Sequence, residues 1–163
     1  MRTCVVAAVV VLLAGCDGST VVTEPHHRFQ FAAVGAAAAE GSGDHELWRM
    51  EQPALTVTAQ RIPSSSSEVG ERTLDTVASA LADRWSLQEI PGSMTKSRCA
   101  AGGTTGWCFV GWSEGHAHPD SHVQRSGVLV PVHGDFYLLE VIGENRSDVD
   151  RQASLIRATF KAL

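Results

Sequence analysis

The sequence predicts an α+β domain in which an antiparallel sheet carries two packed helices. Three observations lead to this class. Apolar residues alternate with period 2 along several stretches, which is typical of strands. Two other stretches repeat their apolar residues every three or four positions, which is the spacing of one helix face. Because each helix has a single apolar face, both are expected to lie on the sheet.

The first predicted strand and helix come from the middle of the chain. Residues 55–59 alternate, and the strand that they predict ends at the polar loop 62–67. A helix is predicted over about residues 71–85, because apolar side chains recur there at helical spacing. These side chains are Leu74, Val77, Ala78, Leu81 and Trp85.

Three β-rich stretches follow, at residues 107–112, 123–132 and 136–142. The segment 100–106, with three glycines and two threonines, is predicted to be a flexible flank of the first stretch. His133-Gly134-Asp135 predicts a tight hairpin that joins the second stretch to the third.

The last predicted element is a C-terminal helix. Ser147 and Asp150 resemble a capping box with Asp in place of Glu, so Ser147 is predicted to cap this helix. The apolar stripe that follows consists of Val149, Ala153, Ile156 and Phe160. The predicted order is therefore two strands, a helix, several antiparallel strands and a second helix.

The chain divides into a leader, a linker and one domain. Residues 1–15 have a positive start, an apolar core and small residues at the end, which is typical of a secretory signal peptide. Residues 16–45 are rich in Gly, Ala, Ser and Thr and predict a flexible tether. Residues 46–163 are predicted to form the single domain. A first strand at 27–31, where two phenylalanines alternate, is the alternative to a tether there.

The end of the leader carries a sharper signal. Leu13-Ala14-Gly15-Cys16 resembles the lipobox of bacterial lipoproteins, in which the cysteine is acylated and becomes the new N-terminus. The resemblance implies a palmitate-type lipid on Cys16 and a location at the cell membrane, facing the periplasm or extracytoplasmic space. The apolar run is shorter than the roughly 20 residues of a transmembrane helix.

Charge limits the classes of partner. The formal net charge is −5, and the sequence has no cluster of Lys and Arg. Since phosphate neutralisation needs a basic stripe, a nucleic-acid partner is excluded. The membrane is expected to be contacted through the lipid alone.

Cysteine counting leaves one pair. Cys4 lies in the leader and Cys16 takes the lipid, so Cys99 and Cys108 remain. Their C-x8-C spacing fits no compact zinc motif, and the extracytoplasmic space is oxidising. A disulfide between Cys99 and Cys108 is predicted.

A family resemblance covers about residues 47–163. The segment Leu55-Thr-Val-Thr-Ala-Gln-Arg-Ile-Pro63, the following helix, the hairpin and the ending Ile156-Arg-Ala-Thr-Phe160 resemble the DcrB/DUF1795 family. The resemblance implies a PsbP-like α/β sandwich without an established catalytic site. Some members of that family are envelope lipoproteins.

Two clusters raise the question of catalysis. Gly111-Trp112-Ser113-Glu114-Gly115 matches the nucleophile elbow, which requires a sharp turn from strand to helix. Turn residues follow instead, so Ser113 is predicted to have no catalytic role.

A possible metal site comes from four side chains spaced by two, His116, His118, Asp120 and His122. In an extended segment this spacing places all four on one side, and the set suits zinc or copper. A solvated hairpin tip is the alternative, and no other cofactor is predicted.

The tryptophans indicate where a partner would bind. Trp48 and Trp85 are predicted to lie in the core. Trp107 and Trp112 are an odd interval apart, so at most one faces the core of a regular strand and the other is a candidate binding residue.

The favoured hypothesis is a lipid-anchored, non-catalytic module that binds a protein partner, either as an immunity protein or as part of an envelope complex. The alternative is a small metal-binding or hydrolytic protein that uses Ser113 and the cluster from His116 to His122.

Overall fold

The computed structural model describes residues 18–23, 28–35, 39–40, 46–52, 54–66, 70–87, 90–114 and 122–163. The leader and the lipidation residue Cys16 lie outside these ranges. Within the described part of the chain, no helix is long and apolar enough to cross a membrane.

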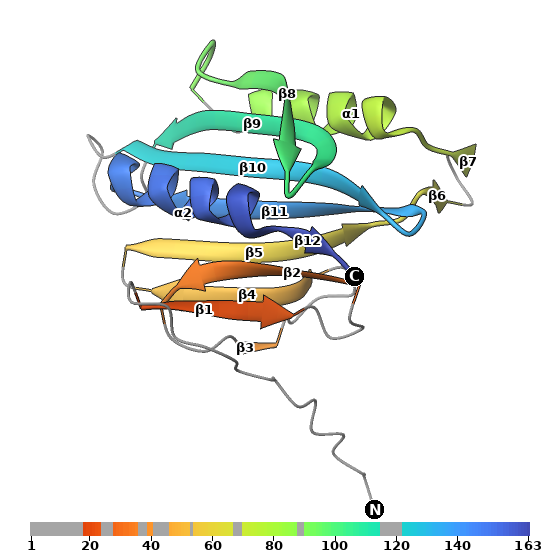
Figure 1. The fold of residues 1–163 in the computed structure, drawn as a ribbon. Helices are drawn as coiled ribbons and strands as arrows, with labels where there is room; N and C mark the ends of the chain where they lie inside the picture. The colour runs from red at the N-terminus through yellow and green to blue at the C-terminus, as the bar shows by residue number, and fades with distance from the viewer. Residues whose placement is uncertain are drawn as a thin grey trace, which may run out of the picture.

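A seven-stranded antiparallel sheet forms the centre of the molecule, in the order β3-β4-β5-β11-β10-β9-β8 (Figure 1). In that order the strands are Ala39–Glu40, Glu46–Gln52, Leu55–Ile62, Asp135–Gly143, His122–Val132, Thr104–Glu114 and Thr95–Ala101. The strands that the alternating pattern predicted are present, and each is longer than its predicted core. Between β5 and the first helix, the chain forms a short antiparallel ribbon of two strands with two residues each, β6 (Ser65–Ser66) and β7 (Gly70–Glu71).

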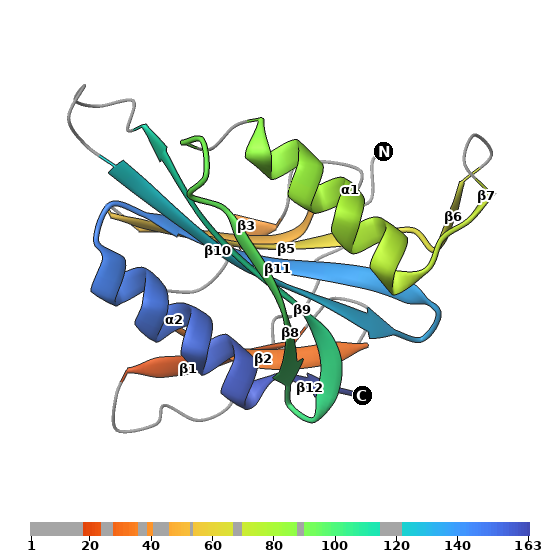
Figure 2. The ribbon, with the colours of Figure 1, turned by 90° about the horizontal axis from the view of Figure 1, so that it is seen from above.

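The two helices cover opposite faces of this sheet (Figure 2). Helix α1 (Leu74–Ser86) packs on one face, where its buried residues meet Phe109, Leu129, Phe136 and Leu138. Helix α2 (Arg146–Thr159) packs on the other face. The residues that α1 buries are Val77, Ala78, Leu81, Ala82 and Trp85. The predicted α+β fold class, an antiparallel sheet with two helices packed on it, is confirmed.

A second, three-stranded sheet lies on the α2 side and corrects the predicted tether. It has the order β1-β2-β12 and consists of Ser19–Thr23, Phe29–Val34 and Lys161–Ala162. Phe29 and Phe31 are 0% and 1% exposed and belong to the main core. The alternation of these two side chains was a true strand signal, so the domain includes residues 19–23 and 28–35. The remaining residues of the 16–45 segment, apart from Gly18 and the short strand β3, lie outside the described residues.

Two tight turns shape the sheet. The predicted hairpin between β10 and β11 is present, with positive φ at His133 (49°) and Gly134 (89°). The segment 100–106 is not the flexible flank that its composition predicted. It contains a second hairpin, in which Gly102 (φ 53°) and Gly103 (φ 85°) join β8 to β9. Both turns need left-handed backbone at two successive residues, which glycine adopts without steric cost.

The cap of α2 lies two residues earlier than predicted. Asn145 is the N-cap, and its side-chain oxygen accepts a hydrogen bond from the backbone N–H of Ser147. Ser147 is therefore a residue of the first helical turn. Asn and Ser both serve well as N-caps, so the residue type alone did not distinguish them.

Candidate functional site

A groove runs between α1 and the end of β5. It encloses about 490 Å³, which lies within the usual range of small-molecule sites. We call it the α1 groove. Its apolar lining comes from both elements and from the residue after β5: Ile62, Pro63, Val77, Ala80 and Leu81. Val77 and Leu81 are almost fully buried, so the accessible apolar surface of the groove comes mainly from Ile62, Pro63 and Ala80.

The charged side chains that line the α1 groove are all positive. Among its described lining residues the charged ones are Arg61, Arg72 and Arg84, and the polar ones are Gln60 and Thr76. Arg61 is held by Asp135, with 2.7 Å between Nη2 and Oδ2. The three arginines come from β5, from the loop before α1 and from the last turn of α1. In a chain of net charge −5, this is a local concentration of positive charge.

A buried ion pair lies on the same face of the sheet, near the end of α1. Glu140 is 6% exposed, and its Oε1 lies 3.0 Å from Nε of Arg125. The guanidinium of Arg125 also lies over the ring of Trp85, 5.0 Å from its centroid. Burial raises the pKa of the Glu140 carboxyl above 4.5, and the charges of Arg125 and Arg84 oppose that rise.

The raised pKa of Glu140 makes the stability depend on pH. Because the folded protein holds this proton more tightly than the unfolded chain, the free energy of unfolding is expected to fall as pH rises from about 4.5 through the raised pKa. Glu140→Gln is expected to remove this downward slope. Urea denaturation of both proteins between acid and neutral pH measures it. Glu144→Gln, at an exposed position, is the matched control and should keep the wild-type slope.

Trp107 is held on the α1 face of the sheet by charged neighbours. Its Nε1 donates a hydrogen bond to Oδ1 of Asp75, at 2.9 Å, and the guanidinium of Arg98 lies 4.3 Å from its ring centroid. Lys96 lies over the same ring at 5.0 Å. The side chain is half-buried.

Trp112 lies five residues further along β9, and the alternation of side chains places it on the opposite face. It is also half-buried, and Arg146 at the start of α2 lies 5.7 Å from its ring. Both rings are half-buried with a cation over each, so neither is fully exposed, and a binding role for Trp107 or Trp112 stays a prediction. Trp48 and Trp85 are both buried, as predicted.

The predicted catalytic and metal residues are only partly described. Ser113 pairs with Val123 within the β9–β10 ladder, so its backbone is that of a regular strand and not of a strand-to-helix elbow. His122 is exposed at the start of β10. His116, His118 and Asp120 lie outside the described residues. Among the described residues, no group of three or more His, Cys, Asp or Glu side chains is placed to hold a metal ion.

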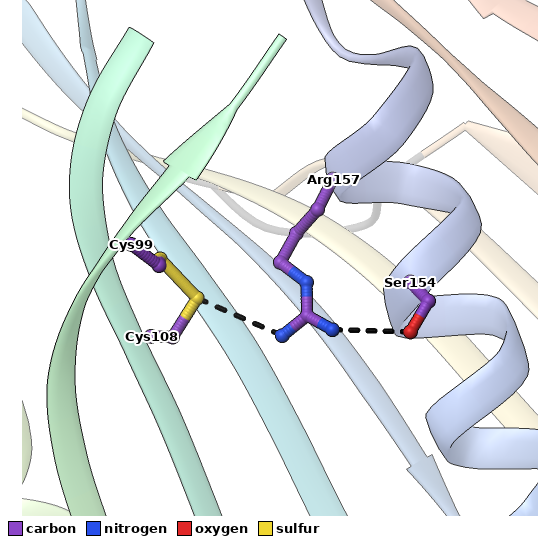
Figure 3. Close-up of a disulfide and its surroundings, with 4 residues drawn as sticks. All are labelled: Cys99, Cys108, Ser154 and Arg157. Atoms are coloured by element: carbon purple, nitrogen blue, oxygen red, sulfur yellow. Dashed lines mark hydrogen bonds between the residues drawn. A yellow bond between two sulfur atoms is a disulfide. The ribbon is translucent and has the colours of Figure 1, made fainter. Parts of the chain in front are cut away.

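Cys99 and Cys108 are joined by a disulfide that links β8 to β9 (Figure 3). Their Cα atoms are 5.8 Å apart. Figure 3 shows that Arg157 of α2 extends toward this bond, with 3.7 Å between its Nη1 and the Sγ of Cys108. Its other terminal nitrogen donates to Oγ of Ser154 at 3.1 Å. The disulfide thus contacts α2 as well as joining the two strands.

Sequence reasoning missed the α1 groove. Thr76, Ala80 and Arg84 recur at intervals of four and share one face of α1, beside the predicted apolar stripe. That spacing could have predicted a margin along the helix that is polar at both ends and apolar at Ala80. The pairing of this margin with Arg61 and Pro63 depends on how α1 crosses the sheet, which no local pattern contains.

Comparison with known proteins identifies the fold. No protein-family model matches the sequence, and no curated protein matches it. The structure is similar to the cyanobacterial PsbP protein (CyanoP) from Synechocystis sp. PCC 6803, with a TM-score of 0.63 and 9% identity, over 91% of this chain and 95% of that one. It also matches LpqN, described as involved in cell envelope biogenesis of Mycobacterium tuberculosis, with a TM-score of 0.48 and 11% identity, over 96% and 84% of the two chains. The similarity to CyanoP shows that the protein has a PsbP-like fold.

Proposed function

We propose that this protein is a non-catalytic binding module of the bacterial cell envelope. A lipid on Cys16 anchors it, and the β8–β9 hairpin holds a protein partner. The leader and lipobox pattern support both the anchor and the envelope location. An immunity protein against a delivered toxin and a subunit of an envelope complex are the two forms of this function.

The observation that carries the proposal is the exposed position of β8. This strand ends the order of the seven-stranded sheet, and residues 95–98 are exposed. Strands at sheet edges are templates for pairing with another chain. Lys96 and Arg98 lie on its α1 face, so the partner is expected to present acidic side chains there.

Trp107 supplies the central contact of this surface. Its ring is already fixed by Asp75 and Arg98, so little side-chain entropy is lost on binding. Trp and Arg are the residue types most enriched among the strongest contacts of interfaces. The surface is also stiffened by the disulfide beneath it.

Absence of catalysis is part of the proposal. The strand backbone at Ser113 lacks the sharp turn that exposes a serine nucleophile and aligns an oxyanion hole. A hydrolytic or metal-binding role for Ser113 and the segment from His116 to His122 remains the competing function. A stoichiometric, chelator-sensitive ion in the purified protein would favour that competitor.

Crosslinking in living cells tests the partner surface. A photo-crosslinking residue in place of Ala100, on the same face as Lys96 and Arg98, is expected to yield one protein adduct of constant mass. Trp107→Ala is expected to weaken binding by about 30-fold, because a tryptophan at the centre of an interface contributes about 2 kcal/mol. Lys96→Glu should also reduce the adduct, since it reverses the charge that faces the partner.

Two controls accompany this experiment. The same probe at Arg151, exposed on α2, should give no adduct of that mass. Fractionation of the cells should place the wild-type chain in the membrane, whereas Cys16→Ser should accumulate as an unprocessed, mislocalised precursor. An adduct that forms equally from both probe positions, or that survives Trp107→Ala and Lys96→Glu undiminished, would refute the proposed surface.

A further inference from the structure

We propose that the α1 groove binds a single-chain anionic amphiphile, a molecule with a carboxylate or phosphate head and one hydrocarbon tail. This site is separate from the partner surface on β8 and goes beyond the function proposed above. The inference rests on the shape, the lining and the charge of the groove.

The apolar part of the groove fits a tail. The helix side of the groove runs from Thr76 to Arg84, about 12 Å along the helix at 1.5 Å per residue. Between these two residues the lining is Val77, Ala80 and Leu81. Ala80 is exposed and small, so it leaves the groove open at its middle. When a hydrocarbon tail moves from water onto this surface, the free energy gained is proportional to the apolar area that is covered.

The charged part of the groove fits an anionic head. Arg84 lies at one end of the apolar stretch and is exposed, and its charge also acts on the buried carboxyl of Glu140. A guanidinium binds carboxylate and phosphate oxygens through two parallel hydrogen bonds. Arg61, which pairs with Asp135, and Arg72 also line the groove, and no described lining residue is acidic. An anionic head placed at this end of the groove would meet the exposed guanidinium of Arg84.

The volume points to a single-chain ligand. About 490 Å³ falls in the lower half of the 300–1,000 Å³ range of small-molecule sites. A two-chain lipid would place one tail outside the groove, in water.

Photolabelling of the full lipidated chain in phosphatidylcholine vesicles tests the site. The probes are dodecanoate and dodecyl phosphate that carry a diazirine in the tail, with the corresponding dodecanol probe as the neutral comparison. Both anionic probes are expected to label peptides that contain residues 60–63 or 76–84, and the dodecanol probe about tenfold less. The anion that gives the stronger label identifies whether the natural head is a carboxylate or a phosphate.

Three variants make the test specific. Arg84→Gln is expected to reduce labelling by about tenfold, the effect of losing one charge-assisted hydrogen bond. Ala80→Trp should abolish it by filling the groove, while the melting temperature stays at the wild-type value because the position is exposed. Arg151→Gln removes the same charge from α2 and should leave labelling unchanged. Equal labelling by dodecanol, or an Arg84→Gln protein that labels like Arg151→Gln, would overturn the assignment.

Discussion

Phe31→Ala is expected to lower the free energy of unfolding by about 3–5 kcal/mol, the usual cost of truncating a buried phenylalanine. Phe31 is 1% exposed, and its ring centroid lies 5.4 Å from that of Trp48 and 6.2 Å from that of Phe29. Truncation would leave a cavity between the small sheet and the main sheet. Such a loss is a large share of the stability of a domain of this size.

Urea denaturation of the full chain measures this loss. Gln30→Ala is the matched control, because Gln30 is the neighbour of Phe31 in β2 and is only half-buried. The control is expected to cost less than about 1 kcal/mol. If Phe31→Ala proved as mild as Gln30→Ala, residues 28–35 would behave as the tether that composition predicted, and the structural correction would be wrong.

Removal of the Cys99–Cys108 disulfide is expected to cost about 2–3 kcal/mol of stability. The bond closes a loop with a sequence separation of 9, which limits the entropy it removes from the unfolded chain. The double variant Cys99→Ala with Cys108→Ala should therefore unfold at a lower urea concentration than the wild type. Reduction of the wild type should bring it close to the double variant, whose own stability should not respond to the reductant.

Mass spectrometry of unreduced protein from the envelope tests the bond directly. A linked peptide pair that contains Cys99 and Cys108 is expected. Two free, alkylatable thiols would contradict the assignment and would reopen the possibility that both cysteines bind a metal. Ser97→Ala, on exposed β8, is the control for substitution in this hairpin and should leave the unfolding midpoint unchanged.

Elements with strong local signals were predictable. Each helix was predicted from its single apolar face. The β10–β11 hairpin was predicted from a His-Gly turn that permits positive φ. Strand β8 and its Gly102-Gly103 turn were missed, because a strand that buries little of its surface carries few apolar residues. The alternation of Phe29 and Phe31 predicted β2 only as the alternative to a tether, and β1 was missed although four of its five residues are β-branched.

The sequence by itself determined the fold class, both helix faces and the hairpin between β10 and β11, because periodicity and turn chemistry act over a few neighbouring residues. Only the tertiary structure decided which segments meet. The last strand, β12, pairs with β2 near the start of the chain, which makes the N-terminal segment part of the core. The cations that cover Trp107 and Trp112 come from β8 and α2, and the α1 groove takes its lining from two elements and two loop positions. Such contacts depend on how distant segments pack, and no pattern of neighbouring residues records that packing.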